Sequence, residues 1–308
     1  MTELPNEYLQ YSKRREGMDH DHYDWSLLVD RPKVTWPEGK KLAISLTMNL
    51  EFFPLNQKGQ PFKVPGGMTM PYPDLRHFSL REYGNRVGVY RVLDAFGKHG
   101  LKPSIAINGQ LAQRDPFLCQ EIRQLNCEVI GHGWNMDSLH YGGMEPSVET
   151  DYIGKTKAIL SDCFNTEIKG WLSPAKNQSE NTPDHLSSAG FTYMMDWVND
   201  DMPYTFKTKS DPIMAFPLST ELEDKFLLMQ NLQSESLWKE QILSAGEYLK
   251  EEAEEQGGRL LSLNIHPWLM GQAHRIRYLQ DLLATLSSWD DVWFASPSEI
   301  LESFSKSS

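Results

Sequence analysis

The chain contains 308 residues, of which 40% are hydrophobic and 11% aromatic, and this supply of core residues excludes a disordered or fibrous protein. Lys and Arg number 30 against 42 Asp and Glu, and the resulting net charge of −12 disfavours nucleic acids and anionic membranes as partners. No apolar run approaches the ~20 residues that span a bilayer. Residues 1–17 lack the apolar segment of a secretory signal, and the three cysteines show no CxxC spacing. These features predict a cytoplasmic protein with reduced thiols.

The first residues and the rest of the chain differ in their patterning. Residues 1–40 are predicted to form an N-terminal arm, and residues 41–305 are predicted to form a single domain. The arm contains Asp19-His20-Asp21-His22, a spacing that could hold a metal ion. The alternative, which we favour, is a surface segment whose two histidines are solvated.

Hydrophobic periodicity beyond the arm alternates between strands and helices. The predicted strands are 42–48, 103–107, 128–130, 169–172, 191–195, 260–265 and 292–294. The predicted helices are 89–96, 116–125, 146–164, 183–189, 274–286, one from Leu237 to the Gly257-Gly258 pair, and a last one that opens with a capping box from Ser296 to Glu299. Residues 52–79 are rich in Pro and Gly, which predicts a long irregular loop over an active site, and the section before Leu237 is expected to be irregular.

Repeated strand–helix units without a strand-only stretch predict a parallel sheet with helices outside it. At this length we expect the sheet to close into a barrel, and a doubly wound sheet is the alternative. In either architecture, ligands bind at the carboxyl ends of the strands. The residues that follow the predicted strands include Asn49, Glu51, Asn108, His132, Trp134, Trp171, His266 and Trp268.

These strand-end residues predict a reaction site. Two histidines and a carboxylate at one barrel mouth favour acid–base chemistry, although a single histidine after a strand is more often structural. The tryptophans would form flat walls for a ring-shaped substrate, or alternatively would pack the rim. Arg86 lies at the start of a predicted helix and could hold a carbonyl or carboxylate, and the alternative is a salt bridge to the loop. The sequence contains no GxGxxG, P-loop, HExxH or GxSxG motif.

Several short motifs occur in the order found in one enzyme superfamily. They are Met48–Glu51, Glu82–Val89, Gly131–Trp134, Gly170-Trp171, Asp200–Tyr204, His266-Pro267 with Gly271 and Arg275, and Asp291–Ala295. From Trp36 to Leu301 the chain resembles the polysaccharide deacetylase superfamily, and more closely its allantoinase-like branch. The resemblance implies an α/β fold, a distorted (β/α) barrel of about seven parallel strands, assembled as a homo-oligomer (a dimer or tetramer).

Three departures from the pattern of the metal-dependent deacetylases concern the metal site. An Asp pair is replaced by Asn49 and Glu51, the second His of a His-x-x-x-His pair by Met136, and an Arg by Leu172. An amide cannot act as a base, and a thioether is a poor ligand for zinc-like ions. Glu51 and His132 then supply two ligands where zinc normally needs three or more. No cofactor is therefore expected, and a divalent metal at Glu51 and His132 is the alternative.

The resemblance and the strand-end positions suggest a role for each residue. Glu51 acts as the base or accepts a ring N–H, His266 protonates the leaving nitrogen, and His132 hydrogen-bonds the substrate or water. The expected substrate-binding residues are Asn49 and Asn108 as amide donors, Arg86 as an oxyanion partner, and Trp134, Trp171 and Trp268 as ring walls. This set predicts a small-molecule substrate, a cyclic amide such as allantoin, a hydantoin or an imide, whose ring is opened without a metal.

Two functions of other classes remain alternatives. A metal-dependent deacetylase of N-acetylated sugars or polysaccharide would bind zinc or a similar ion. A non-catalytic ligand-binding protein on the same scaffold is favoured if Asn49 marks a loss of activity. In each case residues 52–79 and 197–216, with Met68, Met70 and Met202, are expected to shape the pocket.

Overall fold

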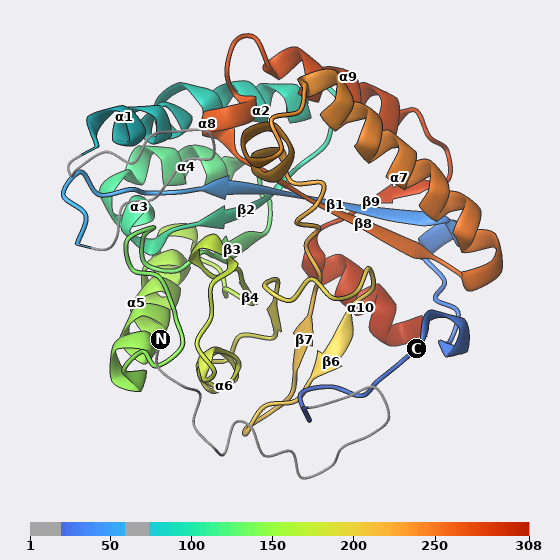
Figure 1. The fold of residues 1–308 in the computed structure, drawn as a ribbon, viewed down its shortest axis with the longest axis horizontal. Coiled ribbons are helices and arrows are strands. Elements are labelled where there is room, and N and C mark those ends of the chain that lie inside the picture. The colour runs from blue at the N-terminus through green and yellow to red at the C-terminus, as the bar shows by residue number, and fades with distance from the viewer. Residues whose placement is uncertain (1–19, 59–73, 308) are drawn as a thin grey trace.

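The computed structural model describes residues 20–58 and 74–307. Their strands form one curled sheet (Figure 1). The strands are β1 (Leu42–Leu50), β2 (Ser104–Ile107), β3 (Val129–Gly131), β4 (Gly170–Trp171), β5 (Tyr193–Met194), β6 (Tyr204–Phe206), β7 (Ile213–Ala215), β8 (Arg259–Ile265) and β9 (Val292–Phe294). Residues 1–19 of the predicted arm, and Met68 and Met70 of the predicted loop, lie outside the described residues.

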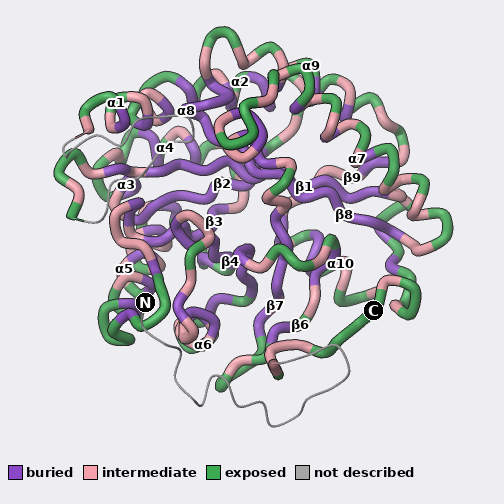
Figure 2. Tube along the Cα trace, in the orientation of Figure 1, coloured by how far each residue is buried: buried purple, intermediate pink, exposed green. Residues whose placement is uncertain are grey.

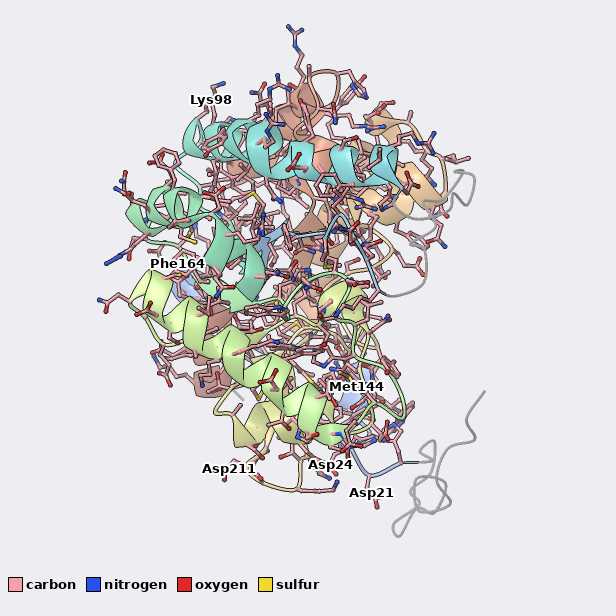
Figure 3. All side chains as sticks on the ribbon, turned by 90° about the vertical axis from the view of Figure 1, so that its left-hand side faces the viewer. Asp21, Asp24, Lys98, Met144, Phe164 and Asp211 are labelled. Atoms are coloured by element: carbon pink, nitrogen blue, oxygen red, sulfur yellow. The ribbon has the colours of Figure 1, made fainter. Side chains whose placement is uncertain are left out.

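Helices cover the outer face of the sheet (Figure 1). They are α1 (Leu75–Tyr83), α2 (Val89–Gly97), α3 (Gly109–Arg114), α4 (Pro116–Gln124), α5 (Pro146–Phe164), α6 (Thr182–Ser188), α7 (Glu235–Gln256), α8 (Pro267–Met270), α9 (Ile276–Ser287) and α10 (Pro297–Ser307). Met144 and Phe164 mark the two ends of α5 in Figure 3. No helix within the described ranges is both long and apolar enough to cross a membrane.

The strand order explains the shape of the sheet. The order is β6-β7-β5-β4-β3-β2-β1-β8, and β9 pairs with the first residues of β1. Every described strand pair is parallel except β6–β7. Ser219, which follows β7, donates its N–H to the C=O of Ser262 in β8 over 3.1 Å, so the two sides of the sheet approach each other. The fold is thus a distorted, incompletely closed (β/α) barrel, and the predicted fold class is confirmed.

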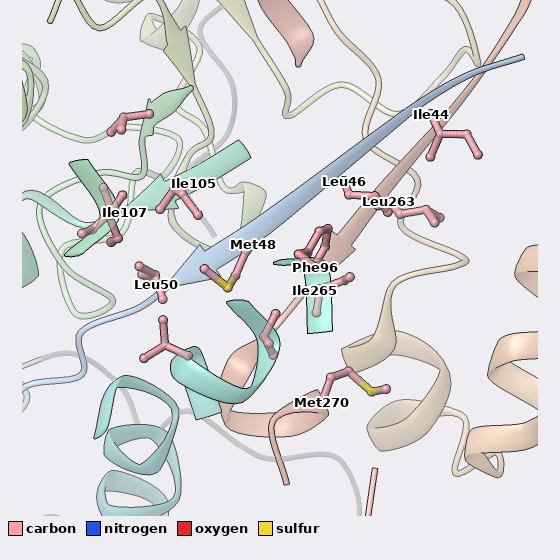
Figure 4. Packing of buried hydrophobic residues seen from close by; sticks show 14 of the residues in the cluster. Ile44, Leu46, Met48, Leu50, Phe96, Ile105, Ile107, Leu263, Ile265 and Met270 are labelled. Atoms are coloured by element: carbon pink, nitrogen blue, oxygen red, sulfur yellow. The ribbon is translucent and has the colours of Figure 1, made fainter. Parts of the chain in front are cut away.

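β1 separates two cores because its side chains alternate between the two faces of the sheet. The helix-facing side is apolar and belongs to the main core of Figure 4, with Ile44, Leu46, Met48 and Leu50. The barrel-facing side carries Ala43, Ser45, Thr47 and Asn49. In β8, Ser262 and Asn264 are in register with Ser45 and Thr47. Figure 2 shows β1 and β8 as buried along their whole length. Small polar residues therefore line the barrel below the strand end that carries Glu51.

Two glycines allow the start of α2 to cross α8 at contact distance. A Cβ added at Gly88 would lie 2.1 Å from the carbonyl oxygen of Pro267, and one added at Gly271 would lie 2.3 Å from Gly88 Cα. Because α8 begins immediately after His266, this crossing fixes the position of His266 and of Trp268. The glycines of the sequence motifs thus act through packing.

Replacing Gly88 with Ala is expected to lower the free energy of unfolding by about 1–3 kcal/mol, because only backbone movement can relieve the overlap. Gly97, at the end of α2, provides a matched control, since a Cβ there meets nothing within 4 Å. Gly97→Ala is expected to stabilise the protein by up to ~1 kcal/mol, because Ala is the better helix former. Denaturant unfolding measures the free energy of unfolding of both variants. Equal stability of the two would contradict the close approach of α2 and α8.

Three predictions of regular structure need correction. Residues 75–79 belong to α1 and not to a loop, because the Asp74 side chain caps the helix by accepting the N–H of His77. The section predicted as irregular contains the antiparallel β6–β7 hairpin, so the chain does include a strand-only stretch. Four short elements were not predicted, because they span too few residues to show a hydrophobic period. They are the helices α3 and α8 and the π-helical turns at Gly84–Gly88 and Lys225–Gln230.

The described part of the N-terminal arm packs on the β6–β7 hairpin. The rings of His22 and Phe206 stack with centroids 5.1 Å apart. Figure 3 shows Asp21 and Asp24 at the same end of the molecule as Asp211, which precedes β7. Two solvated histidines were the favoured expectation, and this is wrong for His22, which is half-buried against the hairpin.

Candidate active site

A cavity of about 470 Å³ lies at the carboxyl ends of the strands. This volume is typical of sites for small molecules. Its polar lining includes Asn49, Glu51, Arg81, His132, Lys176, Asp196, Glu223, Lys225 and Asn264, and its apolar lining includes Leu172, Phe226, Met229 and Trp268. The sequence prediction that ligands bind at this end of the sheet therefore agrees with the position of the cavity.

Glu51, which follows β1, contacts both histidines of the site. Its Oε1 lies 4.0 Å from His132 Nε2 and 3.7 Å from His266 Nε2. Its Oε2 accepts a hydrogen bond from Trp268 Nε1 over 3.2 Å and lies 3.6 Å from Arg81 Nη1. Burial alone would raise the pKa of Glu51, but the charge of His266, the neighbouring His132 ring and the charges of Lys225 and Arg81 hold it well below its usual range. Glu51 is therefore a firmly ionised carboxylate and a weak proton acceptor.

His132, which follows β3, presents a free ring nitrogen to the cavity. Its Nδ1 lies 2.8 Å from the C=O of Leu172 and donates to it, because a carbonyl oxygen can only accept. In the neutral ring the lone pair is then on Nε2. Within residues 20–58 and 74–307, this buried Nε2 has no hydrogen-bond partner. His132 is therefore poised to accept a proton or a hydrogen bond from a molecule in the cavity.

His266, which follows β8, forms a dyad with Asp224. Its Nδ1 lies 2.7 Å from Asp224 Oδ1, and its backbone N–H donates to Asp224 Oδ2 over 2.8 Å. Its Nε2 lies 3.2 Å from Asn49 Nδ2. The ring is fully buried immediately behind Asn49 and Glu51, which line the cavity. The Asn49 amide was expected to face a substrate carbonyl, but its Nδ2 faces His266 Nε2 and donates to it when Nε2 carries no proton. When Nε2 is protonated, the amide can accept from it only by turning over to present Oδ1.

Glu223 and Lys225 belong to a charged group that the sequence analysis missed. Glu223 Oε1 lies 3.4 Å from His266 Nε2 and 3.3 Å from Lys225 Nζ, and it accepts a hydrogen bond from Asn264 over 3.2 Å. Glu223 Oε2 lies 3.6 Å from Lys176 Nζ. Burial would raise the pKa of Glu223, but the charges of Lys225, Lys176 and His266 lower it to about 2. Carboxylates and cations therefore alternate around one wall of the cavity.

The low pKa of Glu223 predicts a pH-dependent stability. A carboxyl whose pKa is lowered from 4.5 to about 2 by folding stabilises the protein above its unfolded pKa, and the contribution is lost as the pH falls toward 2. We expect Glu223→Gln to remove on the order of 3 kcal/mol from the free energy of unfolding at neutral pH. Denaturant titrations between about pH 7 and pH 3 should show a flatter acid slope in the variant. If the free energy of unfolding depends on pH in the variant as it does in the wild type, other carboxylates cause the loss of stability in acid.

The arginine of the site is Arg81, and the prediction of Arg86 is wrong. The Arg86 side chain is 75% exposed and pairs with Glu82 on the helix surface. The Arg81 side chain is 3% exposed, and its guanidinium lies 3.5 Å from the centre of the Trp268 ring. Burial lowers the pKa of Arg81 to about 10, so the side chain remains a cation at neutral pH. Arg81 belongs to α1 and Arg86 to the π-helical turn that follows it, and the two side chains point toward different surroundings.

This correction predicts opposite outcomes for two similar substitutions. Arg81→Met is expected to lower kcat/KM at least ~10-fold, because it removes a cation next to the reacting groups. Arg86→Met is expected to leave kcat/KM within about twofold, because an exposed ion pair contributes little. Steady-state kinetics on both variants checks the assignment, and a larger loss in R86M than in R81M would restore the original prediction.

Three predicted substrate-binding residues have structural roles instead. Trp171 is fully buried and donates its Nε1–H to Ser173 Oγ over 2.9 Å. Trp134 does not line the cavity, and its ring lies 4.5 Å from Lys155 Nζ. The Asn108 side chain accepts the N–H of residue 52 over 2.7 Å and donates to the C=O of residue 132. Asn108 thus ties the segment after β1 to the segment after β3. Of the three predicted tryptophan walls, Trp268 alone borders the cavity.

The side chains of the cavity fit a divalent metal poorly. In the part of the chain that the structure describes, no group of three or more His, Cys, Asp or Glu residues is arranged to hold a metal ion. Glu51 Oε2 is already engaged by Trp268 and lies beside the cation of Arg81. Met136 is buried away from the cavity lining, and His140 pairs with Glu149. A metal would therefore meet a positively charged neighbour and too few ligands.

Comparison with known proteins supports the predicted family resemblance. Residues 82–194 match the family model described as polysaccharide deacetylase, and the fold matches the crystal structure of PuuE allantoinase with a TM-score of 0.81. The family match lies within residues 82–194. The match to PuuE allantoinase has 22% identity and covers 92% of this chain and 98% of that chain. The predicted resemblance is confirmed.

Two further proteins extend the comparison. A probable polysaccharide deacetylase from Pseudomonas aeruginosa PAO1 matches with a TM-score of 0.77 and 23% identity, covering 90% of this chain and 95% of that chain. A Schizosaccharomyces pombe protein whose name proposes a polysaccharide deacetylase is 24% identical over an alignment of 300 residues, gaps included, that covers 88% of this chain and 92% of that protein. The match of residues 82–194 to the polysaccharide deacetylase family model supports a hydrolase of carbon–nitrogen bonds.

Proposed function

We propose that this protein hydrolyses a small cyclic amide of the allantoin, hydantoin or imide type, and that it does so without a metal. The observation that carries the proposal is the arrangement around Glu51. An ionised carboxylate, two imidazoles and the cation of Arg81 meet within 4.0 Å at the wall of a closed-in cavity. Acid–base groups and a fixed positive charge can together replace the Lewis acid that amide hydrolysis otherwise uses.

Glu51 is better suited to hold the substrate than to remove a proton. Its low pKa makes it a weak base but a strong acceptor for a ring N–H. The apolar residues Trp268, Leu172 and Phe226 line the same cavity and can contact the faces of a planar ring. Of the two roles expected for Glu51, we therefore propose that of the ring N–H acceptor.

In the proposed reaction, His132 Nε2 takes a proton from a water molecule, whose oxygen bonds to the ring carbonyl carbon. Arg81 and Lys225 stabilise the negative charge that develops on the carbonyl oxygen. The carbon–nitrogen bond then breaks, and His266 supplies a proton to the leaving nitrogen while Asp224 holds its ring. A nitrogen hydrogen-bonded to Glu51 Oε1 lies near His266, because Glu51 Oε1 and His266 Nε2 are 3.7 Å apart. The product is a ring-opened carboxylic acid.

A panel of substrates tests this proposal. Purified protein is incubated with allantoin, hydantoin, succinimide and N-acetylglucosamine oligomers, and products are followed by chromatography. We expect ring opening of at least one cyclic amide and no release of acetate. Acetate release with no ring opening would favour the sugar deacetylase, and the absence of every product would favour the non-catalytic ligand-binding protein.

A further inference from the structure

A second hollow adjoins the catalytic cavity. It has a volume of about 620 Å³ and shares the lining residues Val198, Thr220 and Phe226 with the cavity that contains Glu51. The two hollows therefore meet at these three side chains. We call the second hollow the seam groove, and define it by Leu218, Leu222, Phe226, Ala245, Leu249 and Leu261, which form its apolar surface.

The seam groove arises from the incomplete closure of the barrel. Pro217–Ser219, after β7, form one side of it, and Leu260–Ser262 of β8 form the other. These two segments are joined by the backbone hydrogen bond from Ser219 to Ser262 and not by a paired ladder. α7 lies along the gap and contributes Ala245 and Leu249. The groove is thus built into the wall of the barrel next to the site.

Charge restricts what the seam groove can accept. Four carboxylates line it, those of Asp200, Asp201, Glu221 and Glu252, and its lining contains no Lys or Arg. Asp200 pairs with Arg31, and Asp201 and Glu252 pair with Arg259. The lining therefore offers an anionic group no cation of its own to bind, whereas a neutral apolar group would be removed from water against leucine side chains. The groove therefore favours a neutral, apolar occupant.

We propose that the substrate of this protein is a cyclic amide with a neutral apolar substituent, and that the substituent lies in the seam groove while the ring lies at Glu51. This inference rests on the proposed ring-opening function. Continuity with the catalytic cavity, through the shared Val198, Thr220 and Phe226, is the reason to assign the groove to the substrate.

A series of substituted rings tests the proposal. We compare kcat/KM for hydantoin, 5-isobutylhydantoin and hydantoin-5-acetic acid. Each fully buried methylene favours binding by about fourfold, so the isobutyl compound is expected to exceed hydantoin at least ~10-fold. The acetic acid derivative is expected to fall below hydantoin. Equal values for hydantoin and the isobutyl compound would overturn the inference.

Variants of α7 localise the effect to the groove. Ala245→Phe fills the groove without touching the catalytic cavity, and is expected to bring the isobutyl-to-hydantoin ratio close to one while leaving hydantoin turnover unchanged. Ser244→Phe, on the exposed side of the same helix, is the matched control and should keep the wild-type ratio. Leu222→Asn, which puts a polar amide on the groove wall, gives a second variant in case A245F does not fold. An unchanged ratio in folded groove variants would contradict the proposal.

Calorimetric binding separates failure of this inference from failure of the proposed function. Tighter binding of 5-isobutylhydantoin than of hydantoin in the wild type but not in A245F, without turnover of either, would support the groove and overturn the hydrolase. Turnover of both rings at equal efficiency would support the hydrolase and overturn the groove.

Discussion

Replacing His266 with Asn is expected to lower kcat for cyclic-amide hydrolysis by about 10²- to 10⁴-fold, the range that a single acid–base group contributes. Asn can keep a donor near Asp224, which bonds His266 Nδ1 over 2.7 Å, while it removes the second ring nitrogen. The measurement is steady-state turnover over a range of pH. If His266 supplies the proton, one limb of the pH profile of kcat/KM should disappear in the variant.

His266→Gln is the companion variant, because its amide reaches toward the position of Nε2 instead. Both variants should remain folded by thermal unfolding and circular dichroism. If kcat/KM falls by the same factor at every pH and both limbs of its pH profile remain, His266 only positions Asn49 and Glu51. Wild-type turnover in both variants would remove it from the mechanism.

Replacing Glu51 with Gln is expected to lower kcat/KM at least ~100-fold, because the change removes the charge that binds the ring N–H and opposes Arg81. The amide of Gln is nearly the same size, so the cavity keeps its shape. Kinetics with the best substrate of the panel measures the loss, and the inhibition constant of an unreactive ring analogue reports ring binding separately.

Glu51→Asp serves as the control for Glu51→Gln. Asp keeps the negative charge, but its shorter side chain places the charge farther from His132 and His266. The decrease in kcat/KM should therefore be smaller for E51D than for E51Q. Since Glu51 is buried beside Arg81, both variants need a stability measurement before their kinetics are compared. If folded E51Q keeps wild-type kcat/KM, neither role expected for this carboxylate is correct.

Long, regular elements of the fold could be predicted from the sequence. α5 occupies 146–164 as expected, because Pro at its first turn and a left-handed residue, Asn165, after its end set both limits. β1 could be predicted because a strand buried on both faces is continuously apolar or small. The β6–β7 hairpin could not, since each strand has three residues and its pairing depends on neighbours distant in sequence.

The candidate site could be predicted only where the topology alone places a residue. Glu51, His132 and His266 each follow a parallel strand, and the carboxyl ends of parallel strands converge at one edge. Arg81 enters from a helix whose orientation depends on packing, so the sequence did not distinguish it from Arg86. Lys176 reaches the cavity from a turn in which its own φ is 57°. The sequence does not predict this left-handed conformation at a lysine.

Glu223 and Lys225 carried a signal that was available in the sequence. The charged run from Glu221 to Lys225 is followed directly by Leu227 and Leu228, which are buried. A solvated charged surface does not normally pass within one turn into a buried apolar pair, and burial of charge requires partners. Such a junction can therefore indicate paired charges at a site.

The most direct measurement is ring-opening activity together with metal content, before and after dialysis against a strong chelator. Our account predicts that the dialysed protein, shown by elemental analysis to hold far less than one metal ion per chain, opens its substrate ring at the original rate. Activity that falls in proportion to the metal removed, and returns when zinc is added, would contradict it.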